Sequence, residues 1–149
     1  MGGMTALFAG LESVMIDTCC FIYHIQGEDY PEFAPSMQEL FALVASGRLK
    51  AVTSPITVVE LMSRPRRLGV EEAASGYKLL LTHFLNMSIP AIDVTVADKA
   101  AALRVLYGLK TPDALQVATG IVYHASAFIT YDRDLLRASP AIKVIIPGE

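Results

Sequence analysis

Val14-Met15-Ile16-Asp17-Thr18 is the stretch that decides the fold, because here a short apolar run stops on a carboxylate. Similar apolar runs rich in β-branched residues recur along the chain, and helical stretches separate them. We expect strands at 13–16, 49–53, 89–93, 127–130 and 142–146. Strands that alternate with helices form a parallel sheet whose right-handed crossovers place helices on its faces. The sequence therefore predicts an α/β fold built on a helix-covered parallel sheet.

The expected helices show the spacing and the start signals of amphipathic helices. In 33–46, apolar residues recur with helical spacing, at Met37, Leu40, Phe41 and Val44. Ser54-Pro55 and Thr111-Pro112 each place a capping side chain before a proline at the first helical position. Further helices are expected at 70–85 and 94–107. Since no repeat, low-complexity tract or linker interrupts this pattern, we expect a single domain over 1–149.

The composition limits the possible partners. Of 149 residues, 53% are hydrophobic and 18% are charged, and the formal net charge is −3. A nucleic-acid substrate would therefore need a local basic patch or bound cations. Cys19 and Cys20 are the only cysteines, and a bridge between adjacent cysteines is strained, so we expect reduced thiols and a cytoplasmic protein. Met1 to Ala6 carries no targeting pattern, and polar residues interrupt the uncharged run 114–131, so we expect no membrane span.

Four carboxylates occupy positions that favour a site. Asp17 and Asp132 each follow a predicted strand, Asp113 lies in the first turn of a predicted helix, and Glu60 lies inside an apolar helix. Each has a structural alternative, because the aspartates could stabilise helix N-termini and the glutamate could be solvated.

The combination of these acids favours a functional interpretation. The carboxyl ends of parallel strands meet at one edge of a sheet, so the three aspartates are expected at the same edge. Carboxylates that converge raise one another's pKa unless a divalent cation neutralises them. Oxygen ligands of this kind suit Mg²⁺ or Mn²⁺ rather than Zn²⁺.

The same motifs resemble a known family, the PIN-domain nucleases. The resemblance rests on four short motifs in the family's order and spacing: Ile16-Asp17-Thr18, Val59-Glu60-Leu61, Thr111-Pro112-Asp113-Ala114 and Thr130-Tyr131-Asp132. Because the chain has little beyond the core domain, it is most similar to the VapC-type toxin ribonucleases of toxin–antitoxin pairs. Cys19 departs from the family pattern, which more often has Ser or Asn there, so hydrogen bonding near Asp17 is expected to be weaker.

The resemblance implies a three-layer α/β/α sandwich with a central, mostly parallel sheet of about five strands. It also implies Mg²⁺-dependent cleavage of RNA phosphodiester bonds, with Mn²⁺ as a possible substitute, a small antitoxin partner and a homodimer. The expected catalytic residues and metal ligands are Asp17, Glu60, Asp113 and Asp132, with Glu60 as ligand or water-orienting base. Thr130 is expected to hold a neighbouring carboxylate through its hydroxyl.

Alternatives remain open at this point. An aspartyl phosphatase of the haloacid dehalogenase type needs a second aspartate where Cys19 stands, and a receiver domain needs paired acids and a late lysine. A catalytically inactive PIN-like scaffold that binds protein or RNA, and a housekeeping RNA-processing nuclease, are further possibilities. Arg64, Arg66 and Arg67, in a predicted loop at 63–69, are either solvated or a basic patch for RNA or an acidic antitoxin segment.

The high apolar content also predicts partner surfaces. The alanine-rich helix 94–107 and the segment 33–44 each offer an apolar face, with Phe33, Met37 and Phe41 available to a partner. We expect a homodimer that buries one of these faces. A groove near the acidic site is expected to bind an antitoxin whose basic side chain displaces or mimics the metal.

Overall fold

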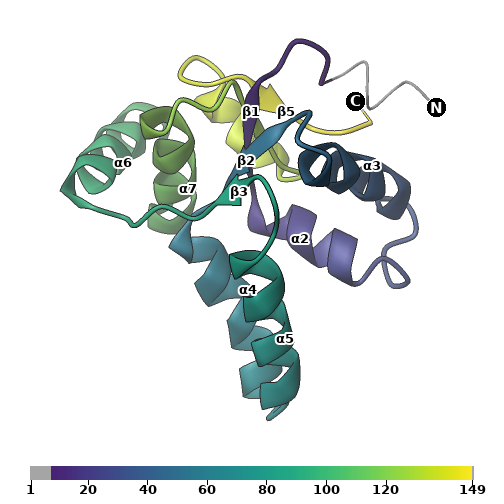
Figure 1. Cartoon of the computed structure of the whole chain (residues 1–149). Coiled ribbons are helices and arrows are strands. Elements are labelled where there is room, and N and C mark those ends of the chain that lie inside the picture. Colours follow the sequence, from purple (N-terminus) through teal and green to yellow (C-terminus); the bar gives the residue numbers. More distant parts are fainter. Residues whose placement is uncertain (1–7, 149) are drawn as a thin grey trace.

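A five-stranded parallel sheet forms the centre of the computed structural model, which describes residues 8–148 (Figure 1). The strands are β1 (Ser13–Ile16), β2 (Lys50–Val52), β3 (Met87–Ser88), β4 (Ala127–Ile129) and β5 (Val144–Ile145). Their order is β3-β2-β1-β4-β5, and every neighbouring pair is parallel. The predicted parallel sheet is confirmed, whereas the expectation for Met1 to Ala6 lies outside the described residues.

Helices cover both faces of this sheet. They are α2 (Thr18–Ile25), α3 (Ala34–Ala45), α4 (Pro55–Arg67), α5 (Glu71–Thr82), α6 (Val94–Tyr107), α7 (Thr111–Val122) and the 3-10 helix η1 (Arg133–Ala138). Because side chains alternate along a strand, Val14 and Ile16 pack in one layer with α2 to α5, and Met15 packs in the other with α6 and α7. Figure 1 shows the α4–α5 hairpin extending away from the sheet. The expected three-layer sandwich is confirmed, and no helix within residues 8–148 has the length and apolar character to cross a membrane.

Local signals set most of the helix ends. Ser54 caps α4 by accepting a hydrogen bond from the Ile56 amide at 3.0 Å, with proline at the first helical position as predicted. The helix predicted at 94–107 has these same bounds and ends at Gly108, whose φ of 67° suits glycine. The start of α7 differs from the prediction, because the Lys110 carbonyl already accepts from the Ala114 amide and Lys110 is the capping residue. Asp113 is therefore the third helical residue.

Two predictions of local structure were wrong. The third strand lies at Met87–Ser88 instead of 89–93, where Pro90 lacks the amide hydrogen that a strand ladder needs. The arginines expected in a loop lie in the last turns of α4. That helix continues through the buried Pro65 because α4 packs along α5, although proline removes one helical hydrogen bond.

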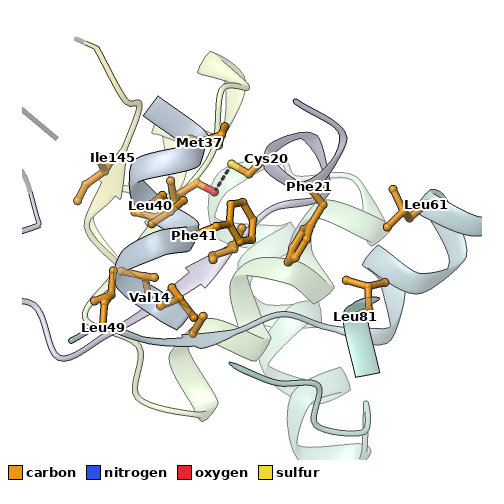
Figure 2. Packing of buried hydrophobic residues seen from close by; sticks show 14 of the residues in the cluster. Val14, Cys20, Phe21, Met37, Leu40, Phe41, Leu49, Leu61, Leu81 and Ile145 are labelled. Carbon is orange, nitrogen blue, oxygen red and sulfur yellow. Dashed lines mark hydrogen bonds between the residues drawn. The ribbon is translucent and has the colours of Figure 1, made fainter. Parts of the chain in front are cut away.

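The apolar side of α3 belongs to the core. Met37 and Phe41 are at most 2% exposed, and the ring of Phe41 contacts Phe21 edge to face at 5.2 Å between centroids (Figure 2). The expectation that 33–44 offers Met37 and Phe41 to a partner is therefore wrong, because this face of the sheet needs a cover. By contrast, α6 exposes 87% of Val105 and 69% of Leu106.

Candidate active site

Four acids from four separate elements line one open pocket at the carboxyl edge of the sheet. Asp17 follows β1, Asp132 follows β4, Asp113 lies in the first turn of α7, and Glu60 lies in the middle of α4. The pocket has a volume of about 350 Å³, and no lysine or arginine of the described residues lines it. The structure thus brings together all four acids that the sequence predicts.

Asp17 is held in a fixed orientation by hydrogen bonds to both carboxylate oxygens. Oδ1 accepts from the Thr18 amide at 2.8 Å and from Gln116 Nε2 at 3.3 Å. Oδ2 accepts from the Thr130 hydroxyl at 2.7 Å, which is the role predicted for Thr130. The thiol of Cys19 lies 3.8 Å from Oδ2, a long contact that agrees with the weaker bonding expected there.

Buried polar side chains connect Asp17 to Glu60. The Thr18 hydroxyl donates to Glu60 Oε1 at 2.7 Å. Gln116 Nε2 also donates to the Thr57 hydroxyl at 2.9 Å, and the Ser54 hydroxyl donates to Gln116 Oε1, which orients the amide. This network fixes Asp17 and Glu60 relative to each other.

The sequence analysis missed Thr57 and Gln116. A local signal was present for both, because Gln116 lies three residues after Asp113 and Thr57 three residues before Glu60. Residues three apart share a helix face, so a polar residue at this spacing from a candidate ligand is itself a candidate for the site.

Burial and mutual repulsion raise the pKa of two of the acids. Desolvation raises the pKa of Asp17, an effect that the hydrogen bonds from Thr130, Thr18 and Gln116 oppose and the charge of Glu60 reinforces. Desolvation also raises the pKa of Asp113. The charges of Asp17 and Asp132 add to this rise, and Lys110 and Arg137 oppose it. The pocket thus stores unfavourable negative charge.

Asp132 has a second role as a helix cap. Its Oδ1 accepts from the Asp134 amide at 3.0 Å at the start of η1, and its own amide donates to the Thr130 hydroxyl at 3.0 Å. Thr130 therefore contacts Asp17 through its hydroxyl hydrogen and Asp132 through its oxygen. The structural and the functional interpretation of Asp132 are compatible, because the cap uses one carboxylate oxygen.

The four acids line the pocket without converging on a single point. Within residues 8–148, no three Asp, Glu, His or Cys side chains form a group that could hold a metal ion. Water molecules would have to complete the coordination of any ion in this pocket.

A second hollow of about 320 Å³ adjoins the acid pocket and shares Ile22 and Glu60 with it. Arg64 lines this hollow one turn after Glu60 on α4. Arg66 instead pairs with Glu71 at 3.5 Å on the exposed side of the α4–α5 hairpin. Of the three predicted cations, only Arg64 lines the hollow next to the acids, since Arg66 and Arg67 are exposed and line neither cavity.

The sheet order and the acid pocket define a class of protein. The sequence profile of the PIN domain matches residues 14–139, a range that contains all four acids, so the chain belongs to the PIN domain family. No curated protein matches the chain in sequence.

Solved structures of toxin–antitoxin complexes have a similar fold. A toxin–antitoxin complex from Klebsiella pneumoniae aligns with a TM-score of 0.67 and 23% identity over 93% of this chain and 99% of that chain. VapBC2 from Rickettsia felis, bound to a promoter DNA fragment, aligns with a TM-score of 0.70 and 16% identity over 89% and 97%. DNA-bound VapBC from Salmonella typhimurium gives 0.69 and 19% over 91% and 97%. At these identities, the likeness establishes the fold.

Proposed function

We propose that this PIN domain is a Mg²⁺-dependent ribonuclease and the toxin of a toxin–antitoxin pair. The observation that carries the proposal is one open pocket lined by four carboxylates and by no lysine or arginine of residues 8–148. A pocket that raises the pKa of its own acids lowers stability unless a cation from solution compensates. The similarity to toxin–antitoxin complexes supports the biological context.

The donor set fits Mg²⁺, with Mn²⁺ as a substitute. Every candidate ligand is a carboxylate oxygen, which these hard cations prefer, and the wide spacing of the acids suits an ion that keeps several of its waters. When bound, the ion would neutralise charge on the phosphoryl group and favour ionisation of an attacking water molecule.

The chain's own residues orient the groups that face the substrate. Thr130, Thr18 and Gln116 fix Asp17 before any ligand binds, so no reorganisation is needed at that carboxylate. The Thr18 hydroxyl engages Oε1 of Glu60, and Oε2 is available to ligate the ion or to orient a water molecule. Asp113 and Asp132 line the opposite elements of the pocket as further ligands.

A nuclease assay with matched variants tests this proposal. The purified protein should cut mixed-sequence RNA in Mg²⁺ or Mn²⁺ and stop in EDTA. Asp113→Asn and Glu60→Gln, purified identically, should lose cleavage, whereas Asp98→Asn on the exposed side of α6 should keep it. If neither ion supports cleavage and calorimetry detects no ion binding at millimolar concentration, the protein is an inactive scaffold instead.

The second hollow is the proposed antitoxin groove. It combines apolar residues of α2, α4 and α5 with Asp29 and Glu60, and through Glu60 it opens onto the acid pocket. An amphipathic helix could fill the apolar part while its basic side chain reaches the acids. Expression of the chain should arrest growth, Asp113→Asn should not, and a co-expressed small protein that co-purifies should restore growth. A housekeeping nuclease would have no such partner.

The exposed side of α6 is the proposed homodimer surface. Val105 and Leu106 lie at its C-terminal end and are mostly exposed. Light scattering should give twice the 16.1 kDa mass of one chain, and Val105→Asp with Leu106→Asp should give the monomer. A monomer across micromolar concentrations in the unaltered protein would exclude the dimer.

A further inference from the structure

Two tyrosines form part of the wall of the acid pocket. Tyr131 directly precedes Asp132, and Tyr23 lies on α2, which begins directly after Asp17. Both side chains line the pocket and both are half-buried. None of the hydrogen bonds that orient the acids uses either tyrosine. The proposed hydrolysis therefore leaves these two rings without a role.

Neighbouring aromatic rings hold the two tyrosines in place. Phe33 stacks on Tyr23 at 4.5 Å between centroids with an interplanar angle of 25°, and it contacts Tyr131 at 4.5 Å. Tyr30 contacts Tyr23 at 4.6 Å, and the two pocket tyrosines meet edge to face at 5.3 Å. Phe33 and Tyr30 do not line the pocket. Rings fixed in this way lose little conformational entropy when a planar ligand binds.

This aromatic wall answers an electrostatic difficulty of the site. The chain has a net charge of −3 and the pocket is lined by carboxylates, so attraction to the phosphate backbone contributes little to binding here. Stacking of a base on an aromatic ring does not depend on charge and is available to every base. A base within a duplex is stacked on its neighbours, so only an unpaired base can offer its face to a protein ring.

We propose that Tyr23 and Tyr131 form a stacking platform for an unpaired nucleobase next to the phosphate in the acid pocket, and that this platform restricts the enzyme to single-stranded RNA. The inference rests on the proposed ribonuclease function and adds the substrate class to it. Tyr23 is the ring to test first, because the α2 helix supports it and it is not adjacent in sequence to a candidate ligand.

Fluorescence of 2-aminopurine separates stacking from a merely structural role of the ring. Short unstructured RNAs with one 2-aminopurine at successive positions are titrated with Asp113→Asn protein, which should bind without cutting. We expect strong quenching at one position and none when the same RNA is paired with its complement. In this background Tyr23→Ala should abolish the quenching and weaken binding about 5- to 150-fold, as expected for loss of one stacked base.

Three further variants keep the test decisive. Tyr23→Phe retains the ring and should behave like the parent, whereas Tyr23→Leu retains apolar volume and should lose the quenching even where Tyr23→Ala fails to fold. Tyr123→Ala is the matched control, because Tyr123 is a half-exposed tyrosine at the C-terminal end of α7, away from Asp113 at its start.

The outcomes distinguish failure of the platform from failure of the ribonuclease. If the unaltered protein cuts RNA but Tyr23→Leu quenches 2-aminopurine and binds like the parent, the rings serve only packing and the platform is refuted. Equal binding and cutting of the duplex would refute it too. If the unaltered protein neither cuts nor binds RNA in Mg²⁺ or Mn²⁺, the ribonuclease proposal fails and the platform fails with it.

Discussion

Thr130→Val removes the hydroxyl that contacts both Asp17 and Asp132 and keeps the shape of a fully buried side chain. The bond to Asp17 is 2.7 Å long and ends on a buried carboxylate, and a hydrogen bond to a charged group contributes about 1.5–3 kcal/mol. The Asp132 amide also loses its acceptor. We therefore expect a loss of about 2–3 kcal/mol of stability at neutral pH, and a loss of about 10- to 100-fold in cleavage because Asp17 is no longer oriented.

The pH dependence of this loss identifies its cause. The Thr130 hydroxyl lowers the pKa of Asp17, so its removal raises a folded-state pKa that burial already holds above 3.8. The destabilisation should be complete above the Asp17 pKa of the variant and should shrink as the pH falls through the parent value. The reason is that a protonated carboxyl gains less from the same donor, by about 1.4 kcal/mol for each unit of pKa difference.

Urea unfolding of the metal-free protein at neutral and acidic pH provides the measurement. Thr95→Val, on the exposed surface of α6, is the control and should leave both values unchanged. A loss below about 0.5 kcal/mol at neutral pH, or an equal loss at both pH values, would refute the view that the Thr130–Asp17 bond organises the site.

Three further predictions concern the charge, the metal and the packing of the site. In EDTA, the raised pKa of Asp113 means that the folded state binds more protons than the unfolded state, so stability should fall as the pH rises from 3.8 through the folded value; Asp113→Asn should lessen this fall in urea titrations, and a variant clearly less stable than the parent would show a structural role. Mg²⁺ should raise the melting temperature measured by circular dichroism, by an amount equivalent to about 2.7 kcal/mol at a hundredfold excess over Kd, and the shift should vanish when all four acids are replaced by amides. Gly120→Ala would place a Cβ 2.9 Å from Met15 Cβ and should cost about 1–2 kcal/mol, because overpacking outweighs the gain in helix propensity; Gly76→Ala, with nothing within 4 Å, should instead stabilise α5 in the same urea assay.

The elements of this fold were largely predictable because their signals are local. The strand at 13–16 and the helix at 94–107 were predicted with the bounds that the structure has. An apolar run before an aspartate, or an aspartate before a helical stripe, needs no information from elsewhere in the chain. The predictions failed where a distant contact decides the outcome, as at Pro65, which stays helical because α4 packs along α5.

The partner surfaces show the same limit. An apolar stripe predicts that a helix buries one face but does not identify what covers that face. For α3 the cover is the sheet and α2, so Phe41 packs on Phe21 in the core. For α6 part of the apolar surface is left exposed at Val105 and Leu106. Both helices had been equal candidates, because composition carries no information on which surface the core consumes.

The sequence by itself determined which acids belong to the site and at which edge of the sheet they lie. The physical reason is that parallel strands bring their carboxyl ends together, so Asp17 and Asp132 are placed by topology alone. Only the tertiary structure decided how these acids are held. The Asp17–Thr130 and Asp17–Gln116 contacts join residues 113 and 99 positions apart, and their existence depends on how α7 and β4 pack against β1. Hydrogen bonds require atoms within a few tenths of an ångström of their positions, and that precision comes from the packed core rather than from any local pattern.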